Sequence, residues 1–167
     1  MDKPNDIKQI SVRWNLLLPF HGFFAMTLVG KMWIRKSNRD KWSFYERTGK
    51  ANIMKNHELI HVKQAVSTGN SWLKFYLKYV LEWIKCIPII NGFNFSYFMN
   101  SFELEAYGNE SDMTYNTVNF DGATEWKKYA RLSNKKRKEL WKIYKSKKHM
   151  SFSNFVKNYV KQEIGKK

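Results

Sequence analysis

The sequence predicts an α+β fold that is mainly helical, with a small β-sheet near the N-terminus and basic helices at the C-terminus. Two apolar, aromatic-rich runs, residues 11–18 and 23–34, come first and have the composition of strands. Longer segments with helical spacing of apolar residues follow from residue 51 onwards. Residues 127–167 then carry +13 of the net charge of +16.

The composition is that of a globular chain. With 43% hydrophobic and 17% aromatic residues, 167 residues can bury a core, which excludes a globally disordered protein. The single cysteine excludes an internal disulfide and a cysteine-rich metal site. No signal peptide is visible, and the apolar stretch 14–34 contains Pro19, His21 and Lys31, which disfavour a membrane span. We therefore expect a cytoplasmic protein, with peripheral membrane contact as the alternative.

The two apolar runs are expected to form two strands, because Pro19 and the His21-Gly22 pair separate them. Residues 35–50 are polar and contain turn signals. Beyond them, the pattern predicts helices over residues 51–68, 71–87, about 100–107, 125–148 and 151–164, with a turn at Asn91-Gly92 and a loop over 112–124. We place a first domain at residues 1–125 and a basic helical extension at 126–167.

The helix expected over residues 71–87 is unusually apolar. Its polar residues fall on one narrow stripe, and they are Lys74, Lys78, Glu82 and Lys85. So narrow a polar stripe indicates a helix that is mostly buried, or one that lies in a membrane interface. We favour the buried helix.

The residues that carry chemistry are His57, Glu58 and His61, in the pattern His-Glu-x-x-His on the helix expected over residues 51–68. Two histidines four apart lie on the same helix face, so their imidazoles can converge on one zinc ion at about 2.0–2.1 Å. Glu58 flanks that face and can accept a proton from a zinc-bound water without being a ligand. Zinc lowers the pKa of such a water towards 7, which suits attack on a carbonyl.

A catalytic zinc ion takes three protein ligands and a water. The other histidines are His21 and His149, and His149 lies among lysines that would repel a cation. The acidic pair Glu103 and Glu105 is the better source of the third ligand. Residues two apart on a helix point about 200° apart, so one carboxylate can face the metal while the other faces away.

The segment His-Glu-Leu-Ile-His at residues 57–61, followed by Glu-Leu-Glu-Ala at 103–106, resembles the gluzincin metallopeptidases, and most of all their minimal members. The resemblance covers roughly residues 14–110 and leaves the basic extension outside it. It implies a minimal zincin-like domain in which Glu58 is catalytic and zinc is held by His57, His61 and the first glutamate of the second segment, Glu103. It also implies that a peptide substrate pairs with the edge of the strand expected over residues 23–34.

Two features differ from the family pattern. Tyr107 stands where these families have aspartate or asparagine. Thermolysin-like enzymes use a different register, in which Glu105 is the ligand and Asn109 stands near the position of a conserved aspartate. We expect Glu103, with Glu105 as the alternative.

Neighbouring polar residues can support the site. Gln64 lies one turn past His61 and either orients a ligand, touches substrate or closes a polar pocket. Tyr107 either stabilises an oxyanion or is a core aromatic residue, and we favour the core. Asn56 either hydrogen-bonds to nearby backbone or is a solvated helix residue, and we favour the latter.

These residues predict a zinc-dependent hydrolase with one Zn²⁺ per chain, most simply a small metallopeptidase acting on a peptide or protein. The alternative is a non-catalytic, zinc-stabilised protein. Residues 127–167 indicate nucleic acid or an anionic membrane surface as a partner, or simply a solvated helical face. The nucleic-acid interpretation combines the cations of residues 135–138 with rings that bases can stack on: Trp126, Tyr129, Trp141 and Tyr144.

Overall fold

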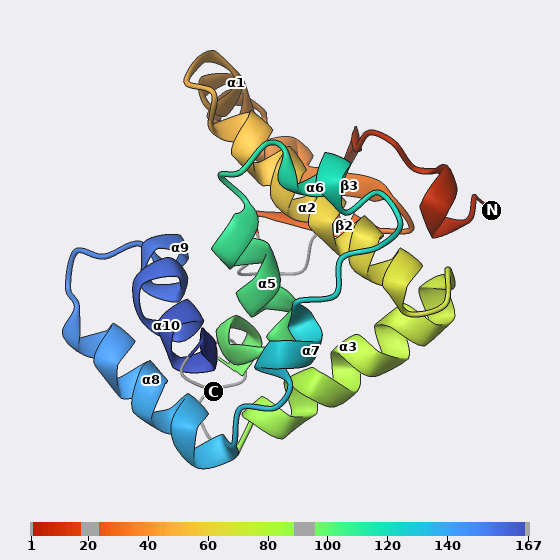
Figure 1. The fold of residues 1–167 in the computed structure, drawn as a ribbon. Helices are drawn as coiled ribbons and strands as arrows, with labels where there is room; N and C mark the ends of the chain where they lie inside the picture. The colour runs from red at the N-terminus through yellow and green to blue at the C-terminus, as the bar shows by residue number, and fades with distance from the viewer. Residues whose placement is uncertain (1, 18–23, 89–95, 166–167) are drawn as a thin grey trace. The chain divides into compact units, whose positions relative to one another are not determined.

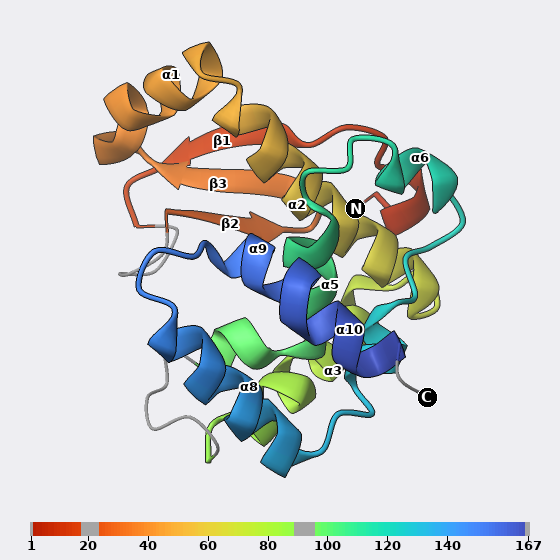
Figure 2. The same cartoon turned by 60° about the vertical axis from the view of Figure 1, so that its left-hand side comes forward.

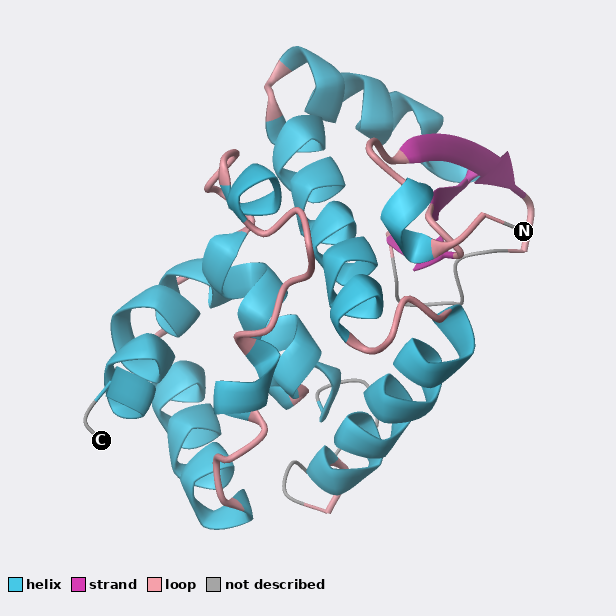
Figure 3. Cartoon of the chain, turned by 45° about the vertical axis from the view of Figure 1, so that its right-hand side comes forward, coloured by secondary structure: helices cyan, strands magenta, loops and turns pink. Residues whose placement is uncertain are grey.

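The computed structural model describes residues 2–17, 24–88 and 96–165, where the chain is mainly helical with one small sheet, as Figure 3 shows. The predicted fold class, mainly helical α+β, is confirmed at this level. Two compact units are present: Met1–Trp72 with Glu110–Ala123, and Leu73–Asn109 with Thr124–Lys167. Within the described ranges, no helix is long and apolar enough to cross a membrane. His21 and the expected turn at Asn91-Gly92 lie outside the described residues.

The sheet of the first unit has three strands rather than two (Figure 2). The strands are β1 (Ser11–Asn15), β2 (Ala25–Leu28) and β3 (Lys31–Arg35), in the order β1-β3-β2. β3 pairs parallel with β1 and antiparallel with β2. The single strand expected over residues 23–34 is therefore wrong. Val29 and Gly30 have φ of 52° and 72°, a pair of left-handed residues that turns the chain into a tight hairpin.

Alternation along β3 fixes which side of the sheet is covered. Met32 and Ile34 are fully buried, whereas their neighbours in the strand are partly or fully exposed. Helix α2 (Lys50–Ser67) contacts β2, and α1 (Arg39–Arg47) contacts α2. The polar, turn-rich segment expected over residues 35–50 is thus largely helical. The apolar periodicity of α1 is weak because Trp42 is its one buried residue, and this ring stacks on Phe24.

A segment from Glu110 to Ala123, which contains the short helix α6 (Tyr115–Val118), lies along α2 (Figure 1). Backbone atoms tie it in place, since the N–H of Ala123 donates to the carbonyl of Lys63 at 3.0 Å. Gly122 allows this approach, because its φ is +132° and a Cβ there would lie 2.9 Å from the backbone nitrogen of Ser67. The loop expected over residues 112–124 is therefore a fixed part of the first unit.

The second unit is built from helices. They are α3 (Trp72–Cys86, of which Trp72 belongs to the first unit), η3 (Tyr97–Met99), α5 (Ser101–Asn109), α7 (Trp126–Tyr129), α8 (Asn134–Ser146), and a continuous helical stretch of α9 (Phe152–Phe155), η4 (Val156–Val160) and α10 (Lys161–Gly165). The single helix expected over residues 125–148 is divided in two. The reason is Ser133, which is extended and caps α8 by accepting a hydrogen bond from the N–H of Lys136.

Basic residues of the expected extension take part in the core of the second unit. Arg137, on α8, is 2% exposed and donates to the carbonyls of Met99 and Tyr129. It also pairs with the Glu82 carboxylate of α3 at 3.5 Å. The domain boundary expected at residue 125 stays a prediction, and residues 126–167 lie in the second unit together with Leu73–Asn109.

The expected burial of the helix over residues 71–87 is wrong for one of its faces. The boundaries are close to those expected, with α3 at Trp72–Cys86. However, five large apolar side chains are 43–69% exposed, and they are Leu73, Leu77, Val80, Leu81 and Ile84. The other face is packed with rings, including the 5.4 Å contact between Phe75 and Phe102.

Candidate metal centre

His57 and His61 lie side by side on α2. Their ring centroids are 5.0 Å apart with an interplanar angle of 79°, and the two residues are 6% and 8% exposed. A spacing of four residues on a helix places both rings on one face. Ile60, on the same helix, is fully buried and anchors α2 in the core of the first unit. The structure thus brings together the two predicted histidine ligands.

A carboxylate that the sequence analysis did not consider fixes the His57 ring. Oε2 of Glu110 lies 2.8 Å from Nδ1 of His57, and both side chains are largely buried. Because a carboxylate accepts hydrogen bonds, this contact places the ring proton on Nδ1 in the neutral imidazole. The lone pair of His57 then resides on Nε2, the nitrogen through which such a ring binds a metal.

Gln64 plays the corresponding part for His61. Its Oε1 lies 2.8 Å from Nδ1 of His61, one turn earlier on the same helix. An amide oxygen accepts the Nδ1 proton, so Nε2 of His61 carries the lone pair. The contact orients the His61 ring, which agrees with one of the three roles considered for Gln64. Two rings with defined tautomers form a donor set that suits zinc.

The position of Glu110 depends on Asn56. The Asn56 side chain is 8% exposed and donates to the carbonyls of Glu110 and Asp112 at 2.8 and 2.9 Å. It also accepts a hydrogen bond from Asn116, at the beginning of α6. The favoured interpretation of Asn56 as a solvated residue is therefore wrong. It holds the returning segment on α2, beside the histidine that Glu110 contacts.

Glu58 is partly exposed on α2, between the two histidines in sequence. It is the one predicted site residue of the first unit that is not buried. Partial exposure suits a group that exchanges protons with a water. Lys63, two residues after His61, is buried, and its ammonium donates to the carbonyl of Phe120. Burial, and then the charge of Lys8, lowers the pKa of Lys63.

In the second unit, Glu103 and Glu105 are both buried on α5 and face different partners. Oε1 of Glu103 accepts a hydrogen bond from the Tyr79 hydroxyl of α3 at 2.5 Å. Oε1 of Glu105 accepts one from the backbone N–H of Glu125 at 2.7 Å, where α7 begins. The two carboxylates thus point to opposite sides of the helix, as their spacing predicts.

Asn109 belongs with Glu105 rather than with the histidine pair. Its amide donates to Oε2 of Glu125 at 3.0 Å, and its oxygen accepts from the ammonium of Lys161 at 2.7 Å. Lys161 lies 4.0 Å from the Glu125 carboxylate. Asn109, Glu125 and Lys161 therefore link α5 to α7 and α10, and Glu105 caps α7 within the same cluster.

Tyr107 has the surroundings of a core aromatic residue, as favoured. Its ring lies 5.0 Å from Phe152 and 5.9 Å from Phe98, within the hydrophobic cluster of the second unit. The stacking residues invoked for nucleic acid are also used inside this unit. Tyr129 is fully buried and Trp126 is 8% exposed, stacked on Phe102. Neither ring is presented to a base.

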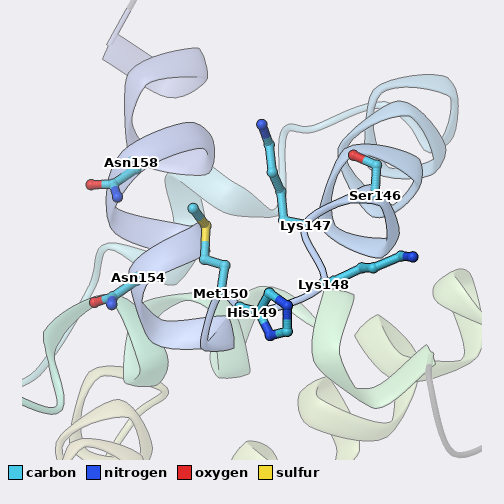
Figure 4. Close-up of a pocket in the computed structure, with 7 residues that line it drawn as sticks. All are labelled: Ser146, Lys147, Lys148, His149, Met150, Asn154 and Asn158. Atoms are coloured by element: carbon cyan, nitrogen blue, oxygen red, sulfur yellow. The ribbon is translucent and has the colours of Figure 1, made fainter.

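A separate hollow of about 480 Å³ lies between the end of α8 and α9–η4 (Figure 4). Its lining residues are Ser146, Lys147, Lys148, His149, Met150, Asn154 and Asn158. None of the predicted zinc ligands lines it. His149, judged a poor ligand because of its lysine neighbours, lies there beside Lys147 and Lys148, so the hollow does not suit a metal cation.

The histidine pair, with Glu110 and Gln64 fixing both rings, can present two nitrogen lone pairs to one metal ion. Neither Glu110 nor Gln64 is a ligand in this arrangement, because each occupies the ring nitrogen opposite the metal. The chain matches no protein-family model, no curated protein and no solved structure.

Proposed function

We propose that this chain is a zinc-dependent hydrolase, a small metallopeptidase of gluzincin type, with one zinc ion per chain. The observation that carries the proposal is the histidine pair on α2, with each Nδ1 held by an oxygen acceptor at 2.8 Å. A helix with two incidental histidines has no need of oxygen acceptors that set both tautomers alike. A zinc site needs both, because neutral imidazole binds the metal through the nitrogen that is not protonated.

In this proposal Glu103 is the third ligand. His57, His61 and Glu103 are all buried, and each offers one atom that can bind a metal ion. Glu103 belongs to the second unit, so its approach to the histidines is itself part of the proposal. The resemblance to gluzincins favours Glu103 over Glu105, since both carboxylates are buried and each already accepts a hydrogen bond.

The chemistry follows from the donor set. Zinc bound there would supply a water whose pKa is lowered towards 7. Glu58, next to His57 on α2 and partly exposed, would accept a proton from that water and return it to the leaving amine. Glu110 and Gln64 keep both rings in the same tautomer and orientation, since each holds the ring proton on Nδ1.

Metal analysis of the purified full-length chain tests the proposal. The wild type should hold about one zinc per chain, the usual content of a catalytic site. His61→Ala and Glu103→Ala should each lose most of it, while Glu105→Ala, the matched change two residues along α5, should retain zinc. A wild-type chain that takes up no zinc at neutral pH would overturn the proposal. Zinc lost from Glu105→Ala and kept by Glu103→Ala would move the third ligand to Glu105.

The non-catalytic alternative shares the metal site and differs in the role of Glu58. If zinc only stabilises the chain, the Glu58 carboxylate has no proton to move, and its replacement changes neither metal content nor any activity. The substrate partner, a peptide or protein, and an anionic partner for residues 127–167 remain proposals. For the latter, exposed lysines on α8 supply the charge, and examples are Lys135, Lys138, Lys142 and Lys145.

A further inference from the structure

Helix α3 presents an apolar stripe to its surroundings. The five exposed apolar residues occupy positions 73, 77, 80, 81 and 84, which is the i, i+4, i+7, i+8, i+11 spacing of a single helix face. Their side chains are 43–69% exposed. Scattered exposed leucines are common on proteins, but a continuous row over three turns of one helix marks a surface that contacts something else.

The buried face of α3 fixes this orientation. Tyr79 stacks with Phe102 at 5.8 Å, and the indole N–H of Trp83 donates to the Ser96 hydroxyl at 2.8 Å. Asn100 also donates to the carbonyl of Tyr79. These contacts lie within the second unit and use the aromatic side of the helix. Rotating the apolar stripe inward would break them, so the stripe remains outside as long as the unit is folded.

The charges beside the stripe are all positive. Lys74, Lys78 and Lys85 are exposed and lie next to it on the helix surface. The one acidic residue of α3, Glu82, is buried and engages Ser101, Arg137 and Lys85. The outward face of α3 therefore combines large apolar side chains with three ammonium groups, of which that of Lys85 is paired with Glu82, and with no exposed carboxylate.

Charge also selects the occupant of this face. A second copy of the chain would bring a net charge of +16 to a chain of the same charge, and like charges oppose association. A partner that accepts both a convex apolar row and adjacent cations must offer an apolar phase beneath a layer of negative charge. A bilayer with anionic headgroups has this structure.

We propose that α3 binds peripherally to an anionic membrane surface. The helix lies in the plane of the interface, with Leu73, Leu77, Val80, Leu81 and Ile84 at the boundary between headgroups and acyl chains. Lys74 and Lys78 pair with lipid phosphates at its side. The contact is made by the second unit through α3, and the basic helix α8 adds only long-range attraction.

Vesicle co-sedimentation of the full-length chain tests this proposal. The probe is phosphatidylcholine vesicles with and without phosphatidylserine. The wild type should sediment with the anionic vesicles and much less with the neutral ones. The double variant Leu77→Ser/Leu81→Ser should reduce partitioning about tenfold or more, because two buried leucine side chains are lost from the interface. Both positions are exposed, so the fold is retained, and far-UV circular dichroism verifies it.

Two matched controls make the test specific to α3. Val118→Ser/Phe120→Ser removes two apolar side chains of the first unit that are at least as exposed as Leu77 and Leu81, and it should leave partitioning unchanged. Lys74→Gln/Lys78→Gln should reduce it about tenfold, whereas Lys138→Gln/Lys142→Gln, the same charge change on α8, should have a clearly smaller effect.

Three results would overturn the proposal. The first is a wild-type chain that fails to bind anionic vesicles. The second is unchanged binding in Leu77→Ser/Leu81→Ser, which would leave the stripe for an acidic protein partner instead. The third is an equal loss in the α3 and α8 lysine variants, which would reduce the interaction to overall charge.

Discussion

Oε2 of Glu110 lies 2.8 Å from Nδ1 of His57, although the two residues are 53 positions apart in the sequence. The contact exists because Asn56, the residue before His57, binds the carbonyl of Glu110. Asn56 thus holds the backbone of Glu110, while the adjacent His57 contacts the Glu110 side chain. This pairing gives the zinc proposal its most direct test outside the ligands themselves.

Glu110→Gln should weaken zinc binding about 10- to 100-fold while leaving the ligands in place, since an amide orients the His57 ring less firmly than a carboxylate. Competition with a chromophoric chelator measures the affinity. Asp121→Asn, the same chemical change at an exposed position on the same segment, is the control and should bind zinc like the wild type. Equal affinity in all three proteins would show that Glu110 does not serve a metal ligand.

Glu58→Gln should keep about one zinc per chain and lose hydrolysis by about 100-fold or more, the usual range for removing a general base. The change preserves size and removes only the ability to accept a proton. Zinc content and turnover of a quenched fluorescent peptide library are measured on the same sample. Undiminished turnover in Glu58→Gln would exclude the proposed role of this residue.

Arg137→Met should destabilise the chain by about 3 kcal/mol, because it removes a charged partner of the buried Glu82 and the donors to the carbonyls of Met99 and Tyr129. Urea denaturation monitored by tryptophan fluorescence reports the change. Lys138→Met, one residue along α8 and exposed, should stay within about 0.5 kcal/mol of the wild type. Similar effects of both variants would mean that Arg137 contributes charge rather than structure.

Gly122→Ala should destabilise the chain by more than about 2 kcal/mol. Its φ of +132° disfavours any side chain, and the new Cβ would lie 2.9 Å from the backbone nitrogen of Ser67. Gly49→Ala shares the positive φ but has nothing within 4 Å, so it isolates the backbone cost of about 1 kcal/mol. Thermal denaturation compares the two, and an equal loss would argue against close packing of Gly122 on α2.

Tyr129 should make stability fall at alkaline pH. Burial raises the pKa of its hydroxyl above the usual value, and the nearby carboxylates of Glu125 and Glu105 raise it further. The unfolded chain then loses this proton above about pH 10 while the folded chain retains it, so stability is present below that pH and is lost as pH rises. Tyr129→Phe should flatten the decline above pH 10 by up to about 1.4 kcal/mol per unit.

The same variant should cost little at pH 7, because the Tyr129 hydroxyl has no hydrogen-bond partner in the described part of the chain. Tyr45→Phe, in α1 of the first unit, is the control and should leave the alkaline decline unchanged. Parallel urea titrations at pH 7 and above pH 10 measure both variants. A decline that persists in Tyr129→Phe would assign the pH dependence to other groups.

The sequence was most informative where periodicity and burial agree. The bounds of α2 and α3 were close to those predicted, because each helix has a long apolar pattern and a clear stop at Gly69-Asn70 or Pro88. The histidine pair followed from helix geometry alone. Predictions were wrong where one or two residues decide the local structure. Val29-Gly30 makes a hairpin out of an expected strand, and Ser133 divides an expected helix.

Long-range partners were outside the reach of sequence reasoning. Glu110 follows a helix that carries two better candidates, and nothing in its local pattern links it to His57. The outward face of α3 was missed for a different reason. Apolar periodicity shows that a face avoids water, but it does not show which apolar environment that face meets.

The first unit is discontinuous, with Glu110–Ala123 separated from Met1–Trp72 by an entire excursion of the chain. During synthesis, the ribosome must add 53 further residues after His57 before it reaches Glu110, whose carboxylate fixes the tautomer of the His57 ring. His57 therefore lacks the acceptor that fixes its tautomer while residues 73–109 of the second unit are being synthesised. The zinc loading proposed above would consequently be a late event of biogenesis, after the chain has returned to α2.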